Sequence, residues 1–277
     1  MSEKLLDIKD LSVWYKTYRG YAQVVDNVSF FVEKGEKVGL VGESGCGKTT
    51  TMKAILRLQE DGNASVQPGA SIQFDGEDVL GMKKHALLEL RRKKISMISQ
   101  SPMAALNPVF TIGQQMLDVI KYSGYFDKKD RAGMMEAARQ AITSVMISDP
   151  DRILKSYPYQ LSGGMLQRCM IAVALLQRPD IIIADEPTTA LDSMNQREVV
   201  AQFHWIRERF GSSLILVSHD LGVVRQLAQE VLVMKDGVGV EYGGAELFSA
   251  PRHPYTRYLV DTRAALSKAF ERVMRCR

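Results

Sequence analysis

The stretch KVGLVGESGCGKTT, Lys37–Thr50, determines how the rest of the chain can fold. It begins as an apolar strand, passes through a glycine-rich loop and runs into TMKAILRL, which favours a helix. Strand, loop and helix in this order are the context that a phosphate-binding P-loop requires, and the loop fits its pattern of spaced glycines followed by Lys-Thr. The sequence therefore predicts a nucleotide site within an α/β fold.

The residues of the loop supply the contacts that phosphate groups need. Backbone amides between the glycines turn toward phosphate oxygens, Lys48 provides a positive charge for the β and γ phosphates, and Thr49 offers a hydroxyl to Mg²⁺. The predicted nucleotide-binding residues are consecutive: Gly42, Glu43, Ser44, Gly45, Cys46, Gly47, Lys48, Thr49 and Thr50.

The chain around the loop alternates between strand and helix patterns. Apolar runs bounded by turn residues recur as KISMIS, DIIIAD, SLILVS and EVLVMKDG, which predicts a largely parallel sheet. The N-terminal stretches LLDIKDLSVWY and VVDNVSFFVEKGE alternate apolar and polar residues, and ASIQFDGEDV carries an Asp-Gly turn, so we expect an antiparallel layer there. Residues 101–160 lack strand patterns and predict inserted helices, such as TIGQQMLDVIKY.

Composition excludes several classes of protein. The 277 residues carry 36 basic and 32 acidic side chains, and the basic clusters are short, which argues against nucleic-acid binding on charge. Three scattered cysteines support neither a disulfide framework nor a zinc ribbon, and favour a reducing compartment. The first residues, MSEKLLDIKD, mix acidic and basic side chains, and the apolar runs are shorter than the roughly 18 residues that span a bilayer, so we expect neither a secretory leader nor a membrane-spanning helix.

Polar residues follow two of the predicted strands. Asp185 and Glu186 end DIIIADEP, where α/β sheets place their ligands. With a P-loop upstream, Asp185 is suited to hold Mg²⁺ through water, and Glu186 to polarise a water that attacks the γ phosphate. His219 ends LVSH and is predicted to contact phosphate, although a lone histidine is more often a bystander. The sequence therefore favours hydrolysis over binding alone.

The stretch YQLSGGMLQR, Tyr159–Arg168, places two glycines before an apolar helix. Ser162 is a good N-cap and would suffice to begin that helix, whereas glycines inside it would cost about 1 kcal/mol each. The glycines therefore indicate that something approaches the backbone closely, and an anion is the natural ligand at a helix N-terminus. A simple turn before a core helix is the alternative.

In combination, these motifs resemble the nucleotide-binding subunit of an ABC transporter over nearly the whole chain. LSGGM resembles the signature sequence of that family, which implies that Ser162, Gly163 and Gly164 contact the γ phosphate of an ATP held by the opposite subunit. The resemblance places Gln100, in MISQSP, in a loop that senses Mg²⁺ and the attacking water, and Asp192, in TALD, in a loop that couples the two sites.

The resemblance also suggests the adenine contact and the domain bounds. Tyr15 fits the position that stacks on adenine, with Trp14 on the other strand face, although both could be ordinary strand aromatics. We expect one ABC ATPase domain over 1–277, with a P-loop NTPase (RecA-like) core and antiparallel β subdomain. The expected parts are the core and β subdomain in 1–100 and 166–250, a helical subdomain in 101–165 and a C-terminal extension in 251–277.

Two further stretches resemble one branch of the family. SQSPMAALNPVFTIGQQ and PRHPYTRYLV look like the oligopeptide, dipeptide and nickel uptake ATPases, and ADEPTTALD resembles one of the two unlike ATPases that those systems usually employ. The resemblance implies an importer motor on the cytoplasmic face of the inner membrane. Its partners would be permease subunits, a second similar ATPase or a second copy of this chain, and an extracytoplasmic solute-binding protein.

Two alternatives share part of this pattern. A soluble ABC ATPase of DNA repair or chromosome maintenance usually carries long coiled-coil or zinc-bearing insertions, and neither heptads nor cysteine clusters occur here. A small-molecule kinase shares the P-loop but does not explain LSGGM together with DEPTTALD. An importer ATPase that uses ATP and Mg²⁺ accounts for all of the motifs.

Overall fold

The computed structural model describes residues 3–58, 63–127, 129–188, 200–201, 203 and 211–263. The chain divides into two compact units, and each is described by itself. Unit 1 comprises Met1–Leu80 and Leu216–Arg277, and unit 2 comprises Gly81–Ile215. Strand β9 (Ser213–Ser218) contains the point at which the chain returns from unit 2 to unit 1.

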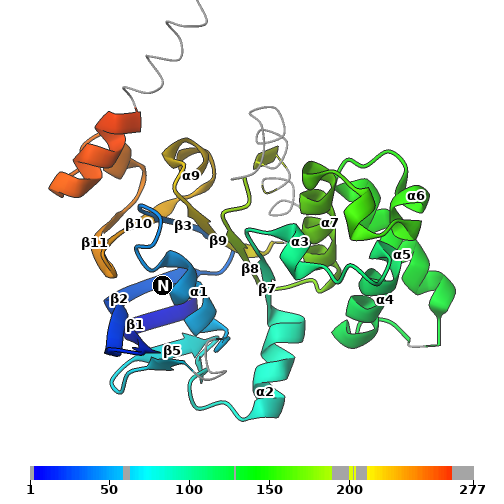
Figure 1. Ribbon diagram of the computed structural model, residues 1–277, viewed down its shortest axis with the longest axis horizontal. Helices are drawn as coiled ribbons and strands as arrows, with labels where there is room; N and C mark the ends of the chain where they lie inside the picture. The colour runs from blue at the N-terminus through cyan, green and yellow to red at the C-terminus, as the bar shows by residue number, and fades with distance from the viewer. Residues whose placement is uncertain are drawn as a thin grey trace, which may run out of the picture. The chain divides into compact units, whose positions relative to one another are not determined.

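Unit 1 begins with an antiparallel sheet, as the alternating N-terminal pattern predicted. Strands β1 (Lys4–Thr17) and β2 (Gly20–Glu33) form a long hairpin, and β5 (Ser71–Phe74) pairs with the other side of β1 (Figure 1). Strand β4 (Ala64–Val66) also pairs with β1, and β6 (Glu77–Asp78) pairs with β5. The turn between β5 and β6 is the predicted Asp75-Gly76, in which both residues have positive φ, 50° and 80°.

The remaining strands of unit 1 surround the predicted P-loop. Strand β3 (Lys37–Val41) is fully buried and runs parallel to β10 (Glu230–Lys235), and β11 (Val238–Gly243) returns antiparallel to β10. The helices of this part are α1 (Lys48–Ile55), α9 (Leu221–Leu227), the short η3 (Ala245–Phe248) and a helix over 254–263. A burial pattern without alternation is what strands covered on both faces require.

Unit 2 contains a parallel strand pair that continues the predicted sheet pattern. Strands β7 (Ile95–Ile98) and β8 (Ile181–Asp185) run in register from the pair Ile95–Ile181 to the pair Ile98–Ala184. Before β7, one of the short basic clusters, KKHALLELRRKK over 83–94, forms α2 (Lys84–Glu89) and the π-helical η1 (Leu90–Lys94). The α/β fold class with antiparallel and parallel strands is thus confirmed.

The middle of unit 2 is helical. Its elements are α3 (Pro102–Ala105), α4 (Ile112–Ser123), α5 (Arg131–Ser144), α6 (Pro150–Lys155), η2 (Pro158–Gln160) and α7 (Gly163–Leu176). Figure 1 shows α4, α5 and α6 gathered beside α7. These helices carry fully buried side chains, among them Met116, Ile120, Ile142 and Ile171. The bounds 101–165 for a helical subdomain remain a prediction.

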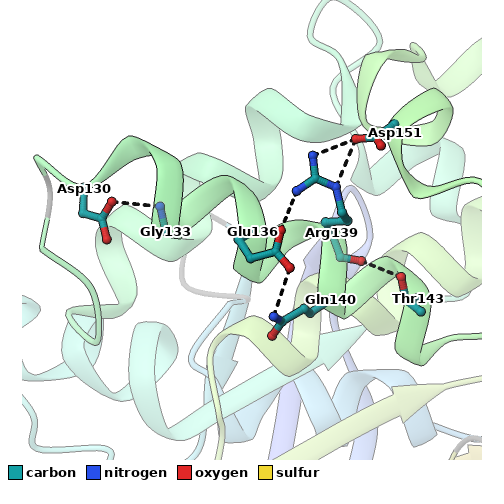
Figure 2. Close-up of polar contacts among 7 residues, drawn as sticks. All are labelled: Asp130, Gly133, Glu136, Arg139, Gln140, Thr143 and Asp151. Carbon is teal, nitrogen blue, oxygen red and sulfur yellow. Dashed lines mark hydrogen bonds and ion pairs between the residues drawn. The ribbon is translucent and has the colours of Figure 1, made fainter.

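Local sequence explains where these helices begin. Thr111 and Gln114 form a reciprocal capping box at α4, and Asp149 caps α6 directly before Pro150. On the surface of α5, Arg139 donates to Asp151 of α6 at 2.9 Å and also pairs with Glu136 (Figure 2). Exposed ion pairs of this kind contribute little stability, so the buried aliphatic side chains hold these helices together.

Within the described ranges, every helix is too short or too polar to cross a bilayer.

Candidate functional site

The predicted P-loop is a loop between β3 and α1. Gly42, Cys46, Gly47 and Lys48 are buried, Thr49 and Thr50 are half-buried, and the loop's crest, Glu43, Ser44 and Gly45, is exposed. Helix α1 begins at Lys48, and the N-cap residue Gly47 has φ 100°. The amides of the first helical turn therefore point out of a glycine-rich loop, which is the geometry that an anion needs.

Two of these glycines are required by their surroundings. A Cβ on Gly47 would lie 2.8 Å from the carbonyl oxygen of Val24 in β2, and its φ lies in the left-handed region. A Cβ on Gly42 would collide with the carbonyl oxygen of Met234 in β10. The loop thus packs tightly against β2 and β10. Its shape depends on these neighbouring strands as well as on its own sequence.

Lys48 lies inside the loop that it follows. Its ammonium donates to the carbonyl oxygens of Gly42 at 2.7 Å and Glu43 at 2.9 Å, and the residue is only 5% exposed. The ammonium lies 3.7 Å from the Cys46 sulfur. Burial raises the pKa of the Cys46 thiol, and the nearby Lys48 only partly offsets this effect. The Cys46 side chain is therefore a protonated thiol at neutral pH that packs inside the loop.

In unit 2, the parallel register brings three predicted site residues to one edge. Because Ile98 of β7 lies opposite Ala184 of β8, the next residues of both strands emerge at the same carboxyl end. Gln100 follows β7 and is exposed, Asp185 ends β8 and is 3% exposed, and Glu186 is half-buried. This edge gathers the two carboxylates that the strand-end argument placed there, together with the amide of Gln100, which only the family resemblance had indicated.

Glu186 has an unusual backbone conformation. Its φ is 51°, in the left-handed region that a residue with a Cβ enters at a cost on the order of 1 kcal/mol. The chain turns sharply at this residue, directly after the buried carboxylate of Asp185. Strained backbone of this kind concentrates at functional sites, which agrees with the expectation for Glu186.

His219 lies at the end of β9, exposed, in a tight turn. The amide of Asp220 donates to the Ser218 hydroxyl at 3.0 Å, and the Asp220 carboxylate accepts from Gly222 at 2.7 Å as the N-cap of α9. The residues on both sides of His219 are therefore fixed, and its imidazole is presented at the surface of unit 1.

The stretch LSGGM forms the start of α7, with the two glycines as its first helical residues. The Ser162 hydroxyl accepts from the Met165 amide at 3.3 Å and caps the helix as predicted. Among the described residues, a Cβ on Gly163 would meet no atom within 4 Å. The described part of the chain therefore gives no steric reason for a glycine at position 163, in contrast to Gly42 and Gly47.

Tyr15 lies half-buried on β1, opposite Ala22 of β2 and Ala64 of β4. Its neighbour Trp14 contacts the ring of Tyr21, with the ring centroids 6.3 Å apart. Because adjacent strand residues point to opposite faces, Tyr15 and Trp14 face different surroundings. Asp192 lies outside the described residues.

Comparison with known proteins decides the family. Residues 25–189, more than half of the chain, match the family model described as ABC transporter. The chain belongs to the ABC transporter family. The resemblance read from the P-loop and LSGGM is thereby confirmed.

Individual relatives of this ABC protein align with most of its length. It is 43% identical to the dipeptide transport ATP-binding protein DppD of Bacillus subtilis (strain 168), over 93% of this chain and 76% of the relative. It is 40% identical to the metal-staphylopine import system ATP-binding protein CntD of Staphylococcus aureus (strain NCTC 8325 / PS 47), over 91% of each.

A solved structure shows the same fold. A dimeric ATP-binding cassette in a post-hydrolysis state, bound to ADP and Pi, superposes with a TM-score of 0.77 and 26% identity, covering 87% of this chain and 98% of that chain. The ABC protein described here is therefore an ATP-binding cassette and an ATPase, and its P-loop NTPase core is confirmed.

One residue of the site was not foreseen. Tyr255, from the stretch HPYT, places its hydroxyl 3.1 Å from the amide nitrogen of Glu43 in the P-loop of this ABC protein. The motif was used only to identify a branch of the family. A tyrosine within a short, conspicuous motif is a signal for a site contact, but only the structure shows that it reaches a loop 212 positions away.

Proposed function

We propose that this chain is the ATP-hydrolysing subunit of an importer for peptides or related small solutes. The observation that carries the proposal is the P-loop between β3 and α1, with the buried Lys48 at its base. Relatives named for dipeptide transport and for metal-staphylopine import align over more than nine-tenths of the chain and support the transport class. Closure of an ATP-bound pair of such subunits would drive a permease, and hydrolysis would reset it.

The roles within the site follow from residue chemistry. Lys48 contacts the β and γ phosphates, the amides of Gly42–Thr50 surround them, and Tyr15 stacks on adenine. Glu186 is the general base for the attacking water, while His219 and Gln100 contact the γ phosphate and that water. The strained φ of Glu186 and the fixed turn around His219 support these assignments.

Mg²⁺ is the proposed metal cofactor. The groups assigned to it are the Thr49 hydroxyl, the Asp185 carboxylate and the Gln100 amide, and oxygen donors of this kind are those that Mg²⁺ prefers. Over the described residues there is no cluster of three or more His, Cys, Asp or Glu side chains that could hold a metal without other donors. The donor set therefore fits an ion held mainly by phosphate and water, which neutralises charge on the phosphates when bound.

The signature stretch is proposed to act on a nucleotide bound by another subunit. Ser162, Gly163 and Gly164 would contact its γ phosphate, and Asp192 would couple the two sites. The open surroundings of Gly163 support this proposal, because the close approach that a glycine permits has no partner within the described chain. The solved neighbour, a dimeric cassette bound to ADP and Pi, supports a paired arrangement.

The partners follow from the transport class. They are two membrane permease subunits, a similar second ATPase or a second copy of this chain, and an extracytoplasmic solute-binding protein, with this chain peripheral on the cytoplasmic face. The helical block over 101–160 would dock on a helix of the permease. Between α3 and α4, the side chains of Val109 and Phe110 are 74% and 50% exposed, and Met103 is 51% exposed, which supports an apolar contact there.

The alternative of a nucleic-acid ATPase gains no support from these relatives. Their names refer to dipeptide transport and to metal-staphylopine import. The division into a core with β subdomain, a helical subdomain over 101–165 and a C-terminal extension over 251–277 remains part of the proposal.

Glu186→Gln tests the function in the native host. The amide cannot act as a base, but it preserves shape and removes a negative charge near the γ phosphate, so ATP should bind and hold the subunits together without turnover.

In a strain that lacks the gene, the wild-type gene and the surface variant Glu136→Gln should restore uptake of a labelled dipeptide, and Glu186→Gln should not. Dipeptide uptake that is unaffected by the deletion would contradict the substrate class. Normal hydrolysis by Glu186→Gln would exclude it as the base.

Purification of the native complex tests the partners. Permease subunits and a second, similar ATPase should co-purify with this chain. Recovery of a functional complex that contains only this chain and the permease would contradict the heteromeric pair and favour a second copy of the chain.

A further inference from the structure

The helix over 254–263 packs directly onto the elements that carry the P-loop. Its residues Thr256, Leu259 and Val260 line a small apolar cavity together with Val41, Val233 and Leu221. Val41 is the last residue of β3, immediately before Gly42, and Leu221 is the first residue of α9. The spacing of Thr256, Leu259 and Val260 places them on one helix face. That face therefore covers the base of the P-loop and the start of α9.

Hydrogen bonds attach the residues before the N-terminus of this helix to β11. The Glu241 carboxylate accepts from the amides of Arg252 at 2.9 Å and His253 at 3.0 Å. The His253 imidazole in turn accepts from the Tyr255 amide at 3.2 Å, and Pro254 occupies the first helical position. These contacts fix the direction in which the Tyr255 side chain leaves the helix.

Tyr255 reaches the P-loop with its hydroxyl. The side chain is buried, its ring lies under the Lys235 ammonium at 5.2 Å from the ring centroid, and its oxygen accepts from the Glu43 amide at 3.1 Å. Burial raises the pKa of Tyr255, and the hydrogen bond from Glu43 only partly offsets this. The hydroxyl is therefore neutral over the physiological pH range.

The peptide group between Gly42 and Glu43 is held at both ends. Its carbonyl oxygen accepts from Lys48 at 2.7 Å, and its N–H donates to Tyr255. A trans peptide is planar, with these two groups pointing in opposite directions, so the two contacts fix its orientation. If the Lys48 ammonium turns from the carbonyl to a phosphate, the Tyr255 contact still holds the other end.

The far end of the same helix reaches the turn that carries His219. The Arg263 guanidinium pairs with the carboxylate of Asp220, which also accepts from the amides of Gly222 and Val223 at the start of α9. Asp220 directly follows His219 and is tied to Ser218 on its other side. Arg263 therefore fixes a residue that sets the backbone path of His219.

We propose that the helix over 254–263 is a positioning element of the ATP site, in which Tyr255 orients the first peptide group of the P-loop and Arg263 orients the turn of His219. The proposal rests on the proposed function, because it uses the roles given there to Lys48 and His219. The two contacts are separated along one helix, so the two halves of the proposal can be tested with different variants.

Tyr255→Phe, made in the full chain, tests the P-loop contact. The variant removes one hydroxyl and keeps the ring, so the fold should be retained while hydrogen exchange of the peptide that contains Glu43 accelerates. Affinity for ATP with Mg²⁺ should fall about threefold to tenfold, the usual effect of one hydrogen bond. Tyr258→Phe is the matched control: it removes a hydroxyl from an exposed tyrosine on the same helix, whose ring stacks on Tyr255. It should change neither quantity.

Arg263→Gln tests the contact with the His219 turn. The variant should lower kcat for ATP severalfold and leave KM near that of wild type, because the P-loop contact is intact. Arg263→Lys keeps the positive charge and should recover most of the turnover. Arg257→Gln, which removes an exposed cation from the same helix, should behave as wild type.

The outcomes separate this proposal from the proposed function. Wild-type exchange and affinity in Tyr255→Phe would overturn the P-loop half. A wild-type kcat in Arg263→Gln, or a loss of turnover that Arg263→Lys does not relieve, would overturn the His219 half. Lys48→Ala serves as the reference. If Lys48→Ala binds and hydrolyses ATP normally, the assignment of the ATP site fails. If Lys48→Ala loses ATP affinity and hydrolysis while Tyr255→Phe and Arg263→Gln behave as wild type, only the positioning role is rejected.

Discussion

The Lys48 ammonium donates a 2.7 Å hydrogen bond to the carbonyl oxygen of Gly42, the residue at the opposite end of the same loop. This contact closes the P-loop on itself, and the second contact, to the Glu43 carbonyl at 2.9 Å, strengthens the closure. Carbonyl oxygens are neutral acceptors, whereas a phosphate is an anion, so a charge-assisted contact would be the stronger of the two. Lys48 thus stabilises the closed loop, and its proposed role is to exchange these carbonyl contacts for a phosphate when a nucleotide binds.

Lys48→Ala should weaken ATP binding by the full chain. The charged contact to the β and γ phosphates contributes a factor of roughly 10 to 100 in affinity, and turnover should become undetectable. The measurement is an ATP titration followed by an ATPase assay of the assembled transporter. Lys53→Ala, which removes an exposed cation from the last turn of α1, is the control and should bind as wild type. Near-normal hydrolysis by Lys48→Ala would overturn the site.

Tyr15→Ala should weaken ATP binding about fivefold to 150-fold, because base–aromatic stacking contributes on the order of 1–3 kcal/mol. Tyr15→Phe should retain most of the affinity, since its ring still stacks. GTP binding should fall by a similar factor, because any base offers a flat face. Trp14→Phe is the comparison, since Trp14 faces Tyr21 and should leave the affinity unchanged. An effect of Trp14→Phe as large as that of Tyr15→Ala would reject the assignment of Tyr15.

Local patterns predicted the elements of the site better than its assembly. Strand β3, the loop and α1 could be recognised because an apolar run, glycines and Lys-Thr lie next to one another in the sequence. Asp185 and Glu186 could be assigned to a sheet edge because they lie at the end of an apolar strand run. In both cases, the physical constraint is local. Gln100 was assigned only by the family resemblance, and the parallel pairing of β7 with β8 shows that it lies at the same edge.

The features that escaped prediction depend on contacts between distant residues. Nothing local to HPYT indicates that Tyr255 accepts from Glu43, because that contact depends on how the helix over 254–263 packs on β3 and α9. Similarly, the stretch KKHALLELRRKK was read by its charge, although Leu87 and Leu90 are buried and the segment is helical. Two buried leucines among many cations give an apolar periodicity that is too weak to predict a helix from the sequence.

Two glycines in helical positions should respond oppositely to alanine. A Cβ on Gly113, in α4, would lie 2.6 Å from the carbonyl oxygen of Leu154, so Gly113→Ala should lower the free energy of unfolding by about 1–3 kcal/mol. Gly163 has open surroundings within the described chain, and alanine favours a helix, so Gly163→Ala should melt at or above the wild-type temperature. Thermal melting checks both.

ATP turnover should distinguish Gly113→Ala from Gly163→Ala in the opposite sense to thermal stability. Gly163→Ala should lower ATP turnover of the assembled transporter by about tenfold or more, because a methyl group would displace the signature backbone from the nucleotide. Turnover per folded molecule should be unchanged in Gly113→Ala. Wild-type turnover in Gly163→Ala would show that no close approach occurs at this glycine.

Ser162→Arg distinguishes a signature that acts on the opposite subunit from a loop that serves its own chain. The hydroxyl of Ser162 accepts from Met165 and caps α7, and the residue is exposed. If Ser162 serves the nucleotide of the opposite subunit, the isolated Ser162→Arg chain should bind ATP almost as wild type, since its own P-loop and Tyr15 are intact. The bulky cation should block the approach of the helix N-terminus to the γ phosphate, and so prevent closure, hydrolysis and transport.

Ser162→Ala controls for the loss of the cap, which costs about 0.5–2 kcal/mol in either variant, and it should retain more turnover than Ser162→Arg because it adds no bulk. The measurements are ATP titrations of the isolated variants and ATPase activity after assembly with the partner. If Ser162→Arg weakens binding by the isolated chain as severely as Lys48→Ala does, the glycine pair belongs to its own chain's site. The composite arrangement of two subunits around each ATP would then be wrong.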